Sequence, residues 1–135
     1  MDPGTYTLIV ELARDRTITV GALGERPFPA GAYAYTGSAF GPGGLARVDR
    51  HREIASGERE TRHWHVDYLL GDAAATIESV VTAPEADIEC AVARSIDAGV
   101  QGFGASDCDC ESHLAHAGDV SALRRTVDDA HAAHR

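Results

Sequence analysis

Residues 31–53 carry the sequence GAYAYTGSAFGPGGLARVDRHRE, in which three structural patterns follow one another. Small and aromatic residues alternate from 32 to 35, which predicts a strand with Tyr33 and Tyr35 on one face. Glycine dominates residues 37–44, which favours a loop, and the residues from Leu45 to about Glu53 are typical of a helix. We therefore expect a strand, a glycine-rich loop and a helix in direct succession.

Strands are expected on both sides of this unit. Residues rich in β-branched and aromatic side chains predict strands over 5–12 and 76–81, with a shorter strand over 17–20. Two glycines and two prolines between residues 21 and 29 predict an irregular insertion there, since both residue types interrupt strands.

Three further helices complete the prediction. Residues 63–70 form a compact apolar segment, typical of a short helix. The run Thr82-Ala83-Pro84-Glu85 matches a capping box with proline in the first turn, so a helix is expected to follow it. The apolar positions of that helix recur at helical spacing: Ile88, Val92 and Ile96. A last helix is expected from Asp119 onward. The chain thus predicts one α+β domain over residues 1–135, a small mixed or antiparallel sheet flanked by helices.

The composition indicates the cellular environment of this domain. The 135 residues include 21 acidic residues against 12 basic ones, all of them arginine, for a formal net charge of −9. An acidic chain without lysine is typical of a halophilic cytoplasm, where a screening length of about 3 Å at 1 M salt weakens self-repulsion. A GC-rich genome or chance gives the same composition. No apolar run is long enough to span a membrane, and the first residues lack a secretory signal pattern. We therefore expect a cytoplasmic protein without a membrane partner.

One segment departs from this acidity. Residues 46–65 hold five arginines against four acidic residues, a local net charge of +1, and three histidines. A phosphate-binding face requires such a patch, although a solvated helix surface with paired charges has the same composition. Candidate nucleic-acid-binding residues in this segment are Arg50, His63 and His65.

The glycine-rich loop has two interpretations. Backbone N–H groups at the start of a helix bind phosphate groups, which would make the loop a nucleic-acid contact. A plain turn fits the same sequence equally well. The candidate contacts of the loop are Gly37, Ser38, Gly43 and Gly44.

Five polar residues occur in an order that a hydrophobic core does not require. Tyr6 lies in the first strand, Tyr35 near the end of a later strand, Arg47 and His51 on one face of the next helix, and Glu89 on a later helix. With the motifs Gly4-Thr5-Tyr6 and Tyr35-Thr36-Gly37, this order resembles the GIY-YIG nuclease superfamily. More closely, the chain is similar to a GIY-YIG-related domain common in archaea and also found fused to endonuclease III. The likeness extends over most of the chain, in residues 31–39, 43–45, 50–51, 63–69, 89–90 and 103–114.

The resemblance implies phosphodiester hydrolysis assisted by one divalent metal, Mg²⁺ or Mn²⁺. It implies that Tyr6 orients or deprotonates the attacking water beside Tyr35, that Arg47 stabilises phosphate charge, and that His51 assists proton transfer or contacts phosphate. Glu89 would hold the metal. A guanidinium group and a hard cation both suit the negative charge of such a transition state. The implied partner is nucleic acid, with DNA expected, and the resemblance also implies association with base-excision repair enzymes.

The chain departs from the superfamily pattern at several points. Thr5 and Thr36 replace the two isoleucines of the motifs, and the stretch between Tyr6 and Tyr35 is longer than a simple hairpin. Asparagine is absent from the sequence, although the superfamily nucleases carry one late in the pattern; Ser106 or Asp107 lies in that neighbourhood. These departures favour a second hypothesis, a non-catalytic nucleic-acid-binding or interaction module on the same fold.

A zinc-stabilised domain is the third hypothesis. Thiolates and imidazoles at short spacing bind zinc, and the chain has such a set: His63, His65, Cys108, Cys110 and His113. The spacing Cys-x-Cys differs from the usual Cys-x₂-Cys of zinc sites. The odd count of three cysteines, without secretory context, favours reduced thiols over a disulfide.

Overall fold

A four-stranded antiparallel sheet forms the centre of the computed structural model, which describes residues 2–21, 24–40, 43–58, 65–96 and 114–134. The strand order is β5-β1-β4-β6. The strands are β1 (Gly4–Leu12), β4 (Gly31–Ser38), β5 (Ala75–Pro84) and β6 (Leu114–Ala117). A separate two-stranded sheet consists of β2 (Arg16–Thr19) and β3 (Glu25–Phe28). The predicted α+β class is confirmed, with an antiparallel sheet.

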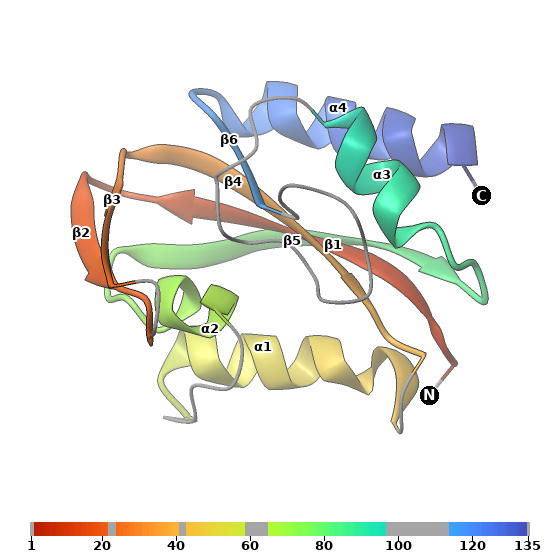
Figure 1. Cartoon of the computed structure of the whole chain (residues 1–135), viewed down its shortest axis with the longest axis horizontal. Helices are drawn as coiled ribbons and strands as arrows, with labels where there is room; N and C mark the ends of the chain where they lie inside the picture. The colour runs from red at the N-terminus through yellow and green to blue at the C-terminus, as the bar shows by residue number, and fades with distance from the viewer. Residues whose placement is uncertain (1, 22–23, 41–42, 59–64, 97–113, 135) are drawn as a thin grey trace.

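Helices cover both faces of the four-stranded sheet (Figure 1). One face carries α1 (Arg47–Ser56), which follows the short 3₁₀ helix η2 (Gly44–Ala46), and α2 (His65–Leu70). The opposite face carries α3 (Glu89–Ser95) and α4 (Val120–His134). Within the part of the chain that the structure describes, no helix is long and apolar enough to cross a membrane.

The central position of β1 explains its nearly continuous apolar sequence. All residues from Gly4 to Val10 are buried, because helices cover the strand from both sides. Leu8 and Val10 pack toward α1 and α2, whereas Ile9 packs toward α3 and α4. Burial of each such side chain contributes about 1.5–3 kcal/mol, so this strand supplies much of the core.

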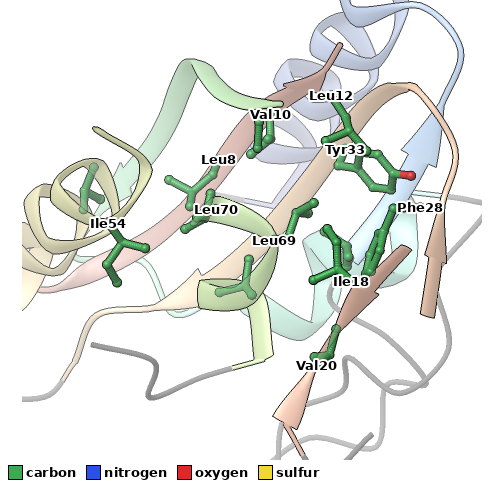
Figure 2. Packing of buried hydrophobic residues seen from close by; sticks show 14 of the residues in the cluster. Leu8, Val10, Leu12, Ile18, Val20, Phe28, Tyr33, Ile54, Leu69 and Leu70 are labelled. Carbon is green, nitrogen blue, oxygen red and sulfur yellow. The ribbon is translucent and has the colours of Figure 1, made fainter. Parts of the chain in front are cut away.

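The hairpin of β2 and β3 corrects the predicted irregular insertion at residues 21–29. Val20 N–H donates to the carbonyl of Gly24 at 2.9 Å, and Gly24 adopts φ 76°, a conformation that glycine tolerates. Figure 2 shows Ile18 and Phe28 of this hairpin packed against the core beside Tyr33. An isolated two-stranded hairpin is marginal in water, so this tertiary contact, which no local pattern reveals, stabilises it.

The helix cap predicted at residues 82–85 is wrong, because β5 continues through Pro84. Thr82, Ala83 and Pro84 pair with Tyr6, Thr5 and Gly4 of β1. β5 is an edge strand. Proline is tolerated in such a strand, although it cannot donate a backbone hydrogen bond to the sheet. The helix itself begins later, at Glu89, and ends at Ser95. Of the predicted apolar residues, Val92 lies within it and is buried, Ile96 is its buried C-cap, and Ile88 is its half-buried N-cap.

The remaining elements match the sequence prediction except for β6. The predicted helices over 45–53 and 63–70 and from Asp119 correspond to η2 with α1, to α2 and to α4. β6 was not predicted, because Leu-Ala-His-Ala contains no β-branched or aromatic residue. Its pairing with the edge of β4, from Ala32 to Tyr35, creates this strand.

Candidate functional site

Tyr6 and His51 meet at the centre of the candidate site. Tyr6 Oη lies 2.8 Å from His51 Nε2, in a buried hydrogen bond between β1 and α1. The ring centroids are 5.5 Å apart, and the side chains are 1% and 0% exposed, respectively. Packing of α1 on this face of the sheet thus joins the tyrosine of the first motif to the helix histidine.

Gly37 provides the space that Tyr6 occupies. The two residues are direct partners in the β1–β4 ladder. A Cβ atom added to Gly37 would lie 2.5 Å from Tyr6 Oη and 2.6 Å from Tyr6 Cζ, far inside van der Waals contact. The Tyr-x-Gly motif therefore has a packing reason, since only glycine admits the Tyr6 ring at this position.

Tyr35 and Arg47 lie around the same pair. The Tyr35 ring centroid is 6.1 Å from that of His51, in an edge-on arrangement. Arg47 Nη1 donates to the carbonyl oxygen of Ser38 at 2.6 Å, which holds the start of α1 against the end of β4. Burial raises the pKa values of both Tyr6 and Tyr35, and the positive charge of Arg47 opposes part of that rise. Arg47 and His51 thus face the site together, as their helical spacing predicts.

Burial dominates the electrostatics of these groups. It raises the pKa of Tyr6, with Tyr35 and Glu89 adding to the increase and Arg47 opposing it. Burial also raises the pKa of Tyr35, again with a contribution from Glu89. It lowers the pKa of His51 to about 4, against the opposing effect of the Asp67 carboxylate. At pH 7 both phenols are protonated and the imidazole is neutral.

Glu89 is the metal-ligand candidate of this group. It is the first residue of α3 and is half-buried, and its charge acts on both phenols, so its carboxylate lies within electrostatic range of them. In the described ranges, no group of three or more His, Cys, Asp or Glu side chains is arranged to hold a metal ion. A single carboxylate suits Mg²⁺, which is commonly bound by one or two carboxylates together with waters and substrate phosphates.

The family model for a domain of unknown function, DUF123, matches residues 5–135. The chain belongs to the DUF123 family. No curated protein and no solved structure matches it. The match begins within the first motif and includes all five candidate catalytic residues, Tyr6, Tyr35, Arg47, His51 and Glu89.

Both motif threonines of this DUF123 chain are buried and make hydrogen bonds. Thr5 Oγ1 donates to the carbonyl of Ala86 at 2.8 Å and accepts from the N–H of Ile88 at 3.1 Å. Ile88 is the N-cap of α3, so this contact fixes the segment that presents Glu89. Isoleucine has no hydroxyl group for such a bond.

Thr36 belongs to a second buried polar group, on the other face of the sheet from His51. Its hydroxyl lies 3.0 Å from that of Thr7, which lies 2.8 Å from His131 Nε2 of α4. All three side chains are buried. The polar contacts link α4 to the centre of the sheet and give His131 a structural role.

The predicted loop contacts are placed differently from one another. Gly43 is exposed and adopts φ 87°, whereas Gly44 is buried. The N–H groups that follow are already bonded within the chain: Leu45 donates to the Asp2 carbonyl and Ala46 to the Gly43 carbonyl. These bonds correspond to the turn interpretation of the loop.

The predicted binding residues of the basic segment divide into two sets. Arg50 Nη2 lies 3.4 Å from Asp67 Oδ2, and its side chain is 20% exposed. The described part of the chain does not include His63 or the side chain of His65.

The other candidates for a zinc site also lie outside the described residues: Cys108, Cys110 and His113. The same holds for Ser106 and Asp107, the two residues near the position of the missing asparagine. The zinc hypothesis therefore stays a prediction.

Asp67 is the site residue that the sequence analysis missed. It lies in α2, is fully buried, and contacts His51 and Arg50 of α1. A charged residue is almost never fully buried unless it is paired. Its position beside the apolar residues Val66, Leu69 and Leu70 was the available indication.

Proposed function

We propose that this chain is a divalent-metal-dependent nuclease of the GIY-YIG type, which hydrolyses phosphodiester bonds in nucleic acid, with DNA as the expected substrate. The observation that carries the proposal is the buried hydrogen bond between Tyr6 and His51, with Tyr35 and Arg47 beside it. These residues come from three elements, β1, β4 and α1, and hydrophobic packing alone does not require polar groups there. Their chemical types suit phosphoryl chemistry.

The protonation states support a proton relay through Tyr6. In the proposed step, Tyr6 donates its hydroxyl hydrogen to the neutral His51, and its oxygen accepts a hydrogen from the attacking water. As the water oxygen bonds to phosphorus, the water proton passes to Tyr6 Oη and the Tyr6 proton passes to His51 Nε2. The opposite phosphorus–oxygen bond breaks, and the leaving oxygen takes a proton from solvent. The raised pKa of Tyr6 is tolerated because no phenolate accumulates.

Arg47 and Glu89 complete the proposed site. Arg47 provides positive charge close to both phenols, which suits the phosphate oxygens as they gain charge. Glu89 would hold the cation, Mg²⁺ or Mn²⁺, and the bound cation would supply further positive charge to the phosphate. Thr5 positions Glu89 through its bonds at the start of α3.

A second candidate function rests on the burial of the central pair. Tyr6 is 1% and His51 0% exposed, as expected of core residues. A domain that keeps the fold without catalytic activity would instead bind nucleic acid or a protein partner. Association with base-excision repair enzymes, as implied by the resemblance to the archaeal domain fused to endonuclease III, fits either function.

A cleavage assay separates the two. The purified chain in molar KCl is incubated with duplex, single-stranded, branched and abasic DNA and with RNA, with and without Mg²⁺ or Mn²⁺. The nuclease proposal expects metal-dependent cleavage that Glu89→Ala abolishes. Glu78→Ala, which removes an exposed glutamate of β5, is the matched control and should cleave like the parent.

The other outcomes assign the protein differently. If Glu89→Ala cleaves as well as the parent, Glu89 has no metal role and the nuclease proposal is wrong. Binding without cleavage, which ignores metal and survives Glu89→Ala but is lost in Arg47→Ala, establishes the non-catalytic module instead.

A further inference from the structure

Asp67 lies on the Nδ1 side of His51, the histidine of the proposed proton relay. Its Oδ1 atom is 3.7 Å from His51 Nδ1, and its Oδ2 atom is 3.4 Å from Arg50 Nη2. Both Asp67 and His51 are 0% exposed. The two nitrogens of the His51 ring therefore face different groups, with the Tyr6 hydroxyl at Nε2 and the Asp67 carboxylate on the side of Nδ1.

This arrangement selects between the two neutral forms of the ring. A neutral imidazole carries one hydrogen, on Nδ1 or on Nε2, and the nitrogen without hydrogen is an acceptor. A carboxylate near Nδ1 stabilises the form with hydrogen on that nitrogen. Nε2 is then the acceptor, as a proton transfer from Tyr6 requires.

We propose that Asp67 is a positioning residue, which holds His51 as the Nδ1–H form so that Nε2 can accept the Tyr6 proton. The catalytic part of this inference rests on the proposed nuclease function, whereas the form of the ring does not. Among the described residues, the other groups that act on the imidazole are Arg47 and Arg50 of α1 and the phenol of Tyr35 on β4, and none of them is an anion at pH 7. Within that part of the chain, the Asp67 carboxylate is thus the negative charge that acts on the ring.

A purely structural role for Asp67 is the competing explanation. In that case the carboxylate only neutralises the mostly buried Arg50. The substitution Asp67→Asn separates the two roles, because asparagine has the same shape without the charge. Its amide oxygen is expected to turn to Arg50, which has donors only, and its NH₂ group then faces Nδ1. The ring must respond by moving its hydrogen to Nε2.

The test is an NMR measurement on ¹⁵N-histidine-labelled protein at pH 7, which reports directly which ring nitrogen carries hydrogen. The His51 signals are those lost in His51→Gln. We expect the Nδ1–H form in the parent and the Nε2–H form in Asp67→Asn. Asp72→Asn is the matched control, because it removes the carboxylate charge that pairs with Arg16 of β2 at 3.1 Å, and it should keep the Nδ1–H form.

Each result of these measurements either supports or overturns the proposed role of Asp67. An Nε2–H form of His51 in the parent overturns it, even if the variant does not fold, and so does an unchanged Nδ1–H form in folded Asp67→Asn. In the cleavage assay, Asp67→Asn should lower kcat about 10-fold or more with KM within about twofold, because the substrate contacts are retained. If the parent shows the Nδ1–H form but cleaves no substrate, the positioning role stands and the proposed function fails.

Discussion

Replacing Gly37 with alanine tests the closest packing in the candidate site. The added Cβ would lie 2.5 Å from Tyr6 Oη and 2.6 Å from Tyr6 Cζ, so the phenol ring must move away. Overpacking a core costs about 1–3 kcal/mol. Displacement of the ring also breaks the 2.8 Å bond to His51, which costs about 1 kcal/mol more. We therefore expect Gly37→Ala to lower the free energy of unfolding by about 2–4 kcal/mol.

Urea unfolding in molar KCl measures this effect. With a slope near 2 kcal/mol/M, the expected loss moves the midpoint down by about 1–2 M. Gly118→Ala is the matched control, because a Cβ there meets nothing within 4 Å, and it should be neutral or slightly stabilising. In a Tyr6→Leu background the ring is absent, so Gly37→Ala should cost less than about 1 kcal/mol. If Gly37→Ala costs no more than Gly118→Ala in the parent, the close packing of Tyr6 on Gly37 is refuted.

Three further predictions follow from the site and the composition. Burial lowers the pKa of His51 from 6.5 to about 4. As the pH falls, His51 is therefore protonated in the unfolded chain before it is protonated in the folded chain. Stability should therefore fall by about 3 kcal/mol as the pH drops from about 6.5 to 4, and His51→Gln should lack this component in urea titrations. Thr5→Val removes two bonds to the backbone and should cost about 1–3 kcal/mol in the same assay, whereas Thr126→Val on the exposed side of α4 should change stability by less than about 0.5 kcal/mol. With a net charge of −9, the Tm should rise as KCl increases from 0.1 to 1 M, and equal osmolality of sucrose should raise it less; an equal rise would exclude charge screening as the cause.

Local patterns predicted the elements whose stability is decided by neighbouring residues. The alternation at residues 32–35 and the helical spacing of Arg47 and His51 both gave the correct element and the correct face. β3 and β6 escaped prediction, because their pairing partners lie elsewhere in the chain and their own residues favour strands weakly. The cap expected at residues 82–85 was overridden by nine-residue pairing of β1 with β5.

The sequence by itself determined the fold class, the order of the polar residues and the acidic, lysine-free surface chemistry. It did so because periodicity and composition are local or additive properties. Only the tertiary structure decided that Tyr6 is hydrogen-bonded to His51 and that Gly37 leaves space for the Tyr6 ring. It also decided that Asp67 lies on the Nδ1 side of the His51 imidazole. Those contacts join residues on different elements, and their distances depend on how α1 and α2 pack against the sheet, which no single segment encodes.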